Sequence, residues 1–280
     1  MFEFRTVHMI FFICALAHSL FRGQRENLHR VKISMEENGV RINKFLSEAG
    51  YCSRREADRL IEQGRITVDG KVLCVGCKVM PGQRVRVDGK EIKKEEEMIL
   101  LAFNKPVGIV CTAAKDEKDN IVDYIHYPKR IYPVGRLDKD SQGLILLTNN
   151  GDIVNKMMRA GNMHEKEYEV TVNHDITETF LKKMSGGVPL EELDVVTRPC
   201  AVEKLDVRKF RIILTQGYNR QIRRMCEYCG YKVVKLKRVR IMNIELGSLK
   251  KGKYRRVTAE EWTELNRRIL NSSNTTVMPK

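Results

Sequence analysis

The stretch Gly135-Arg-Leu-Asp-Lys-Asp-Ser-Gln-Gly-Leu-Ile-Leu-Leu-Thr148 joins a polar, glycine-bounded loop directly to four consecutive apolar residues. A short apolar run that follows turn residues is typical of a buried strand. The sequence therefore predicts that the carboxylate of Asp138 is held at the edge of a buried sheet. The glycine spacing fits neither of the common phosphate-binding loops, G-x-x-x-x-G-K-[ST] and G-x-G-x-x-G.

Two chemical interpretations of this loop compete. Asp138 and Asp140 would share a face if the loop is extended, because side chains alternate with a period of two. With Asp152 they could hold Mg²⁺ for metal-dependent cleavage of a phosphodiester, but nothing else in the sequence supplies the expected ligands. We favour a carboxylate that acts directly on a substrate over this metal site and over a purely structural aspartate.

Around this loop, residues 98–270 alternate between strand and helix patterns without a regular βαβ rhythm. Strands are expected at 98–103, 145–148, 168–172 and 210–214, and helices after Asp152, after Thr177, at 219–229 and after a capping box at 258–261. We therefore expect an α+β domain around a mixed, largely antiparallel sheet.

Residues 40–92 predict a smaller α/β domain, in which two short helices precede small strands. Apolar residues recur at helical spacing from Ile42 to Ala49, and Ser53-Arg-Arg-Glu56 has the pattern of a capping box. Asp-Gly pairs at 69–70 and 88–89 are hairpin signals. The two helices would carry a basic outer face made of Lys44, Arg54, Arg55 and Arg59.

Three segments lie outside these two domains. Residues 1–34 include an apolar run at 9–17 that has the pattern of a secretory signal. The basic, cysteine-containing remainder argues against export, so we expect a non-native or dispensable extension that is not part of the fold. Residues 93–97 are expected to form a charged linker that lets the domains move, and residues 271–280 a flexible tail.

Two pairs among the eight cysteines have the spacing of metal ligands, Cys74-x-x-Cys77 and Cys226-x-x-Cys229. The pairs are far apart and fall in different expected domains, whereas a zinc ribbon separates its pairs by roughly 15–20 residues. We therefore expect buried or free thiols, which suit a reducing cytoplasm, and no bound metal.

The formal net charge is +15, and it is concentrated in two regions. Residues 204–256 carry a net charge of +14 and residues 40–90 a net charge of +5. This surplus favours a polyanionic partner, and two basic regions suggest two places where a phosphate backbone lies. The composition excludes a collagen-like fibre and a small disulfide-stabilised secreted domain. No apolar run reaches the roughly 18 residues of an integral membrane span.

Residue blocks in both domains resemble known families. The first domain resembles the S4 RNA-binding domain at Val40-Arg-Ile-Asn-Lys-Phe-Leu46, Ser53-Arg-Arg-Glu-Ala57 and Gly64-Arg-Ile-Thr-Val-Asp-Gly-Lys71. The loop at 135–148 resembles the catalytic motif of pseudouridine synthases, in the ribosomal RNA branch that carries an N-terminal S4 domain, and the blocks at 101–108, 165–170 and 216–225 agree. Three more blocks, 118–123, 159–166 and 240–243, are most similar to the RluF type, which acts on 23S ribosomal RNA.

The resemblance implies an enzyme that isomerises uridine to pseudouridine. Uridine must lose its N1–C1′ bond, turn over and re-attach through C5, with no redox change and therefore no cofactor. The family pattern makes Asp138 the carboxylate that acts on the sugar or the base and Arg223 its neighbouring cation. Tyr168 would lie against the base and take the C5 proton. Attack at C1′, attack at C6 and an elimination all remain open for Asp138.

The resemblance also implies residues that hold the RNA. A base inside folded RNA must be extruded, and Arg136 resembles the arginine that fills the vacated stack in related enzymes. Further phosphate contacts are expected from Arg220 and Arg224 on one helix, and from a strand with Lys235 and Lys237 on one face and Arg238 and Arg240 on the other.

The expected partners are 23S ribosomal RNA and a tRNA, with no membrane, and we expect a cytoplasmic monomer. The main alternative is a non-catalytic RNA-binding factor associated with the ribosome. Such a factor would have no need to keep Asp138, Tyr168 and Arg223 together, and the sequence keeps all three.

Overall fold

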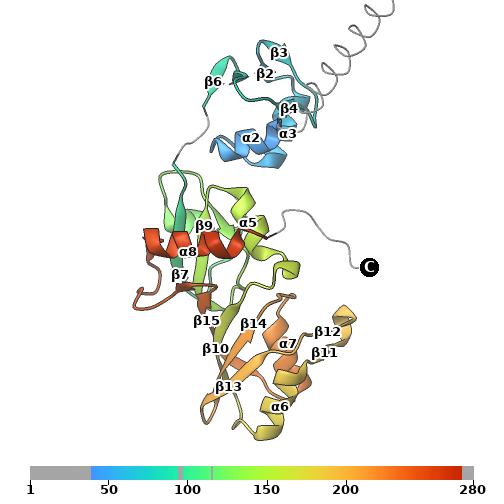
Figure 1. The fold of residues 1–280 in the computed structure, drawn as a ribbon, viewed down its shortest axis with the longest axis vertical. Coiled ribbons are helices and arrows are strands. Elements are labelled where there is room, and N and C mark those ends of the chain that lie inside the picture. The colour runs from blue at the N-terminus through green and yellow to red at the C-terminus, as the bar shows by residue number, and fades with distance from the viewer. Residues whose placement is uncertain (1–38, 94–96, 115, 273–280) are drawn as a thin grey trace, which may run out of the picture. The chain divides into compact units, whose positions relative to one another are not determined.

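The computed structural model describes residues 39–93, 97–114 and 116–272 (Figure 1). The chain divides into two compact units, residues 1–95 and residues 96–280. The extension expected at residues 1–34 lies outside the described residues, as do residues 94–96 of the expected linker and residues 273–280 of the expected tail.

The ends of the second unit are tied to its body. Glu97, expected in the linker, accepts hydrogen bonds from Lys129 Nζ and Arg256 Nη1, both at 2.7 Å. These two cations lower the pKa of the Glu97 carboxyl to about 2. At the other end, Ser272 Oγ lies 2.8 Å from His164 Nε2. Both residues therefore belong to the second unit.

The first unit packs two helices against small antiparallel sheets. Helices α2 (Ile42–Glu48) and α3 (Arg54–Glu62) bury one apolar stripe each in a common core with the strands. The strands are β1 (Val40–Arg41) paired with β4 (Lys78–Val79), and a sheet in the order β3 (Lys71–Val72), β2 (Ile66–Val68), β5 (Val85–Val87) and β6 (Lys90–Ile92). Both expected hairpins are present, because the Asp and Gly of each turn have the positive φ that such turns require.

The start of α3 differs in one detail from the expected capping box. Ser53 Oγ accepts the backbone N–H of Glu56 at 3.1 Å, as predicted. The Glu56 carboxylate instead pairs with Arg59 Nη1 at 3.2 Å, which competes with the return bond to the cap. Arg54, Arg55 and Arg59 are exposed, and Lys44 pairs with Glu48 at 3.4 Å on the same helix.

The described part of the second unit is built on a nine-stranded mixed sheet. Its main path runs β13 (Ala201–Asp206), β14 (Lys209–Leu214), β10 (Lys166–Val172), β15 (Val233–Ile241), β9 (Gln142–Thr148), β7 (Leu100–Lys105) and β17 (Tyr254–Arg256). β8 (Tyr132–Val134) pairs with β9, and β16 (Ile244–Glu245) pairs with β15. The pairing of β9 with β15 is parallel and the other pairings are antiparallel, so the expected α+β architecture is confirmed.

Helices cover this sheet unequally, which explains its two sequence patterns. α5 (Gly151–Met158) and α8 (Ala259–Ile269) pack on one face of β7 and β9, and the other face belongs to the core that also holds α6 (Glu178–Gly186) and α7 (Gln221–Tyr228) (Figure 1). β7 and β9 are buried on both faces, so they read as continuous apolar runs. β10 and β14 alternate buried and half-buried residues, because only one face is covered. No described helix is long and apolar enough to cross a bilayer.

Gly143 allows the parallel strands to meet. It has a φ of +107°, and a Cβ atom at this position would lie 2.2 Å from the carbonyl oxygen of Arg238 on β15. Only glycine tolerates both the dihedral and the close approach. The loop that carries Asp138 ends at this contact, so the tight junction fixes the loop against β15.

Candidate active site

The loop between β8 and β9 borders a cavity of about 680 Å³. Its lining includes loop residues 135–139, the start of β10 and residues 216–223 around the start of α7. Asp138, Tyr168 and Arg223, expected to be catalytic, all contribute to this lining, as do Arg136 and Arg220. Residues far apart in the sequence are therefore gathered around one cavity.

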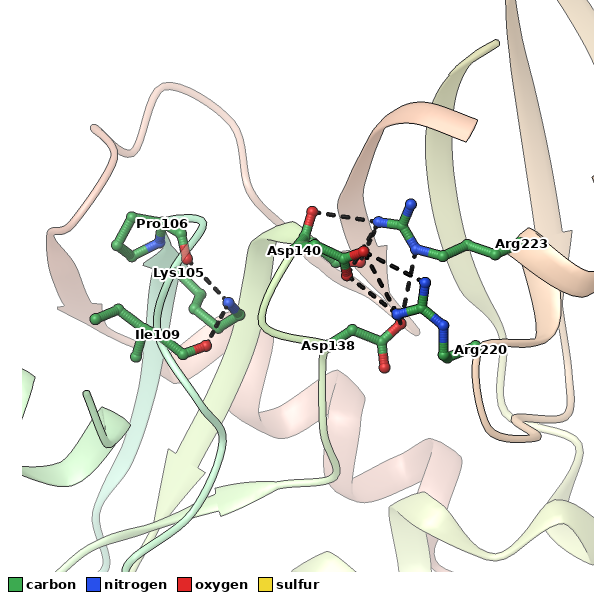
Figure 2. Close-up of polar contacts among 8 residues, drawn as sticks. Lys105, Pro106, Ile109, Asp138, Asp140, Arg220 and Arg223 are labelled. Atoms are coloured by element: carbon green, nitrogen blue, oxygen red, sulfur yellow. Dashed lines mark hydrogen bonds and ion pairs between the residues drawn. The ribbon is translucent and has the colours of Figure 1, made fainter. Parts of the chain in front are cut away.

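Asp138 lies in an ion-pair cluster with Asp140, Arg220 and Arg223 (Figure 2). Its Oδ2 atom is 3.9 Å from Arg220 Nη1 and 4.0 Å from Arg223 Nε. The side chain is 33% exposed, so a substrate that enters the cavity can reach its carboxylate. The two guanidinium groups place positive charge beside this carboxylate.

The Arg223 side chain is buried and fixed by contacts with Asp140 and Ser141, and its Nε atom faces Asp138. Only 7% of the residue is exposed. Its Nη2 atom donates to the carbonyl oxygen of Asp140 and to Ser141 Oγ, both at 3.2 Å, and pairs with the Asp140 carboxylate at 3.2 Å. Its Nε atom is buried without a hydrogen-bond partner among the described residues, and it faces Asp138.

The backbone at the start of α7 separates two arginines that we expected to act together. Arg220 precedes the helix with a left-handed φ of 51°, and its guanidinium lies 3.4 Å from the Asp140 carboxylate. Arg224, inside the helix, forms an ion pair with Glu192 and donates to the carbonyl oxygen of Asn219. Arg220 therefore lies before the helix rather than on it, and the two side chains have different partners, while their binding of phosphate stays a prediction.

Tyr168 presents its ring from β10. It is 9% exposed and lies on the buried face of its strand, as the alternation predicted. The guanidinium carbon of Arg238 lies 6.0 Å from the centre of the ring. Arg136 is exposed beside the cavity, which leaves its guanidinium accessible to an incoming ligand.

A bulge in β15 reverses part of the expected alternation. Glu167 pairs with Arg240 and Tyr168 pairs with Arg238, so Val239 is an extra residue in this strand. Arg240 is therefore turned to the face of Glu167, where its Nε atom donates to Glu167 at 2.7 Å. Arg238 is 2% exposed, on the face of Tyr168. The expectation that Arg238 and Arg240 share a face of the strand is wrong for this reason, and their contact with an RNA backbone stays a prediction.

Two buried lysines beside the cluster were missed in the sequence. Lys105, at the end of β7, is fully buried and donates to the carbonyl oxygens of Pro106 at 2.9 Å and Ile109 at 2.7 Å (Figure 2). Burial lowers its pKa, while Asp138 and Asp140 act in the opposite direction. In the sequence, the feature that could have pointed to Lys105 is its position at the end of an apolar run, directly before proline.

Lys166 is the second of these lysines. It is 8% exposed and lines the cavity. Burial, and then the positive charge of Arg238, lower its pKa to about 8. In the sequence, the feature that could have pointed to Lys166 is its position two residues before Tyr168. This spacing places both side chains on one face of a strand.

The arrangement combines a carboxylate flanked by guanidinium groups with an aromatic ring in an open cavity. A carboxylate in this setting can attack an electrophilic carbon or accept a proton. A planar ligand could stack on the face of Tyr168. The site thus suits a reaction in which a planar, uncharged ring is held beside a reactive carboxylate.

Comparisons with known proteins agree with these features. Residues 99–228 match the family described as RNA pseudouridylate synthase, and residues 40–73 match the S4 domain. The chain is 54% identical over 248 residues to the dual-specificity RNA pseudouridine synthase RluF of Escherichia coli (strain K12), covering 88% of this chain and 84% of that protein. It is 36% identical over 229 residues to the ribosomal large subunit pseudouridine synthase B of Bacillus subtilis (strain 168), covering 79% and 93%.

A solved structure described as a pseudouridylate synthase is also similar. It superposes with a TM-score of 0.60 at 29% sequence identity, and the match covers 81% of this chain and 99% of that one. The similarity therefore extends over most of the length of both chains.

Proposed function

The chain belongs to the RNA pseudouridine synthase family and is an RNA pseudouridine synthase with an S4 domain, and from this premise we propose that it modifies 23S ribosomal RNA and also a tRNA. The relatives named as RluF carry the description dual-specificity, which supports two classes of RNA substrate. The observation that supports the assignment of the site is the buried Nε atom of Arg223, which has no hydrogen-bond partner among the described residues and faces Asp138 in a cavity also lined by Tyr168.

We propose that Asp138 is the group that acts on the sugar or the base. Arg223 faces it with its Nε atom and places a positive charge beside it. Tyr168 stacks against the uracil, and its hydroxyl accepts the C5 proton at the end of the reaction. Attack at C1′, attack at C6 and elimination are all compatible with a carboxylate at this position.

Residues 40–92 are proposed as the RNA-binding S4 domain and residues 98–270 as the catalytic domain. Exposed Arg54, Arg55 and Arg59 on α3 are placed to contact a phosphate backbone, with Lys44 on the preceding helix. Arg136 would take the place of the extruded base. We propose that the enzyme acts as a monomer, in the cytoplasm where its RNA is made.

Carbodiimide-dependent primer extension tests this function directly. Pseudouridine has the same mass as uridine, but it forms a carbodiimide adduct that stops reverse transcriptase. The purified protein should create new stops on 23S ribosomal RNA and tRNA taken from cells that lack its gene. If the protein binds both RNAs without creating a stop in either, the proposed substrates are wrong.

RNA binding should weaken steeply with salt, because basic residues that contact phosphates release bound counterions. With about five phosphate contacts, affinity should fall by roughly 10²-fold or more between 50 and 200 mM salt. Fluorescence anisotropy at a series of salt concentrations measures this slope. Replacing Arg54 and Arg55 with glutamine should reduce the slope by about 1–2, whereas an unchanged slope would contradict their proposed role.

A further inference from the structure

Lys166 is a buried cation without a counter-ion. In the part of the chain that the structure describes, it forms no ion pair with a carboxylate, and its Nζ atom makes a single long hydrogen bond of 3.4 Å, to the carbonyl oxygen of His164. Its strand neighbours Glu165 and Glu167 point to the opposite face, where they bind Arg240. A buried ammonium group with unused donors is costly unless something else compensates it.

Arg238 adds a second buried positive charge beside Lys166. Its Nε atom donates to the carbonyl oxygen of Leu144 at 2.7 Å, and its Nη1 atom to that of Arg136 at 3.5 Å. Its Nη2 atom is buried and has no hydrogen-bond partner among the described residues. Backbone carbonyls thus fix the guanidinium in place but leave a donor unused in the wall of the cavity.

Two adjacent cations with unused donors predict that negative charge is present beside them at some stage of substrate binding or reaction. The position of Lys166 indicates which part of the substrate carries that charge. Lys166 and Tyr168 are two residues apart on one face of β10, a separation of roughly 6.5–7 Å, which matches the width of a pyrimidine ring. A uracil stacked on Tyr168 would therefore extend a carbonyl oxygen towards Lys166, whereas a phosphate would remain nearer the exposed Arg136.

We propose that Lys166, supported by Arg238, stabilises the negative charge that develops on the uracil ring during the reaction. This inference rests on the proposed function of the cavity. It does not depend on the route, because each of the three open routes places an electron pair on the ring. Attack at C1′ and elimination both break the C1′–N1 bond and leave its electrons on the base, and attack at C6 moves electrons towards C5 and O4.

The charge balance of the step is simple. In the route through C1′, a carboxylate oxygen of Asp138 bonds to C1′ while the C1′–N1 electrons pass to the ring and spread over N1, O2 and O4. Lys166 keeps its proton and donates a hydrogen bond to a carbonyl oxygen. C5 then bonds to C1′, and Asp138 leaves with its electrons. The Tyr168 oxygen accepts the C5 proton while its own hydroxyl proton passes through solvent to N1, so the base and Tyr168 both end neutral. Preorganised donors of this kind typically contribute 10²–10³-fold to a rate.

The test replaces Lys166 with methionine, which has a similar length and no charge, and compares it with Lys182→Met, an exposed lysine on α6. We expect Lys166→Met to lower the single-turnover rate about 10²-fold, with RNA affinity within about threefold and an unchanged melting temperature. Lys182→Met should match the wild type. If Lys166→Met weakens RNA binding and leaves the rate intact, Lys166 is a phosphate contact and the proposal is wrong.

A pH profile separates an electrostatic role from a structural one. The charged and titratable groups that act on the Lys166 ammonium are Arg238 on β15 and His164, whose carbonyl oxygen accepts its hydrogen bond. Arg136 and Asp138, on the loop, line the same cavity. If the charged ammonium is required, kcat/KM of the wild type should fall as the pH rises through about 8. Lys166→Arg, which stays charged at higher pH, should restore part of the rate and lose this alkaline decline.

The two possible failures can be told apart. If neither the wild type nor Lys182→Met forms pseudouridine on 23S ribosomal RNA or tRNA, the proposed substrates are wrong. If both form it and Lys166→Met is equally fast, the proposed substrates stand and the role of Lys166 is overturned. An alkaline decline that persists in Lys166→Arg also overturns that role, because another group must then be responsible.

Discussion

Replacing Asp138 with asparagine should abolish pseudouridine formation, with a loss of roughly 10⁴-fold or more in the single-turnover rate. Asparagine has the same shape but is neither a nucleophile nor a base. RNA affinity should stay within a few-fold, because Asp138 lies in the cavity and contributes no positive charge to the binding surface. Carbodiimide-dependent primer extension measures the product, and fluorescence anisotropy measures binding.

Asp140→Asn is the matched control for this variant. Asp140 lies in the same loop and pairs with the same arginines, at 3.4 Å from Arg220 and 3.2 Å from Arg223, but its carboxylate is 47% exposed. We expect it to retain activity within about tenfold of the wild type, since it only supports the cluster. Full activity of Asp138→Asn, or an equal loss in both variants, would contradict the assignment of Asp138.

Replacing Arg223 with methionine should lower the rate by about 10³-fold, which corresponds to roughly 4 kcal/mol of transition-state stabilisation. Its guanidinium group both orients the loop through Asp140 and Ser141 and faces Asp138 with its Nε atom. Arg223→Lys should recover part of the rate, because the charge remains but the planar, two-sided geometry is lost. Single-turnover assays of both variants provide the comparison.

The control for Arg223 is Arg220→Met. Arg220 is at a similar distance from Asp138, 3.9 Å, but its side chain is 43% exposed, and it approaches from a turn rather than from inside a helix. We expect a loss of about tenfold or less. A melting curve for each variant distinguishes catalysis from folding, since Arg223 is also buried. If Arg220→Met loses as much as Arg223→Met at equal stability, the special role of Arg223 is wrong.

Regular hydrophobic patterns made most of the fold predictable. The alternation in β10 and β14, the helical stripes of α2 and α3, and the caps of Ser53, Thr177 and Thr258 all depend on residues near one another in the sequence. The full capping box at Thr258 was confirmed, with Glu261 as its partner. Local rules sufficed for these elements because burial and local preference agree there.

Features that depend on distant partners could not be predicted. The bulge at Val239 arises only in the pairing of β15 with β10, and it reversed the expected side of Arg240. Arg220 has a left-handed conformation before α7, and its side chain pairs with Asp140, whereas that of Arg224 pairs with Glu192. Lys105 and Lys166 are buried by segments that are distant in the sequence and contact them only in the folded chain. Lysine is mostly exposed in folded proteins, so the sequence alone predicts exposed side chains at both positions. For the site, the family resemblance identified several of the residues that line the cavity, but it did not predict which atoms they contact.

The junction between β9 and β15 also sets when the enzyme can first become active during its synthesis. The Arg238 guanidinium binds the carbonyl of Leu144 across 94 residues of sequence, and Arg223 binds the backbone of Asp140 across 83. A nascent chain that has only just released the 135–148 loop from the ribosome has neither cation in place. Catalytic competence is therefore acquired late, after β15 emerges and closes these long-range contacts.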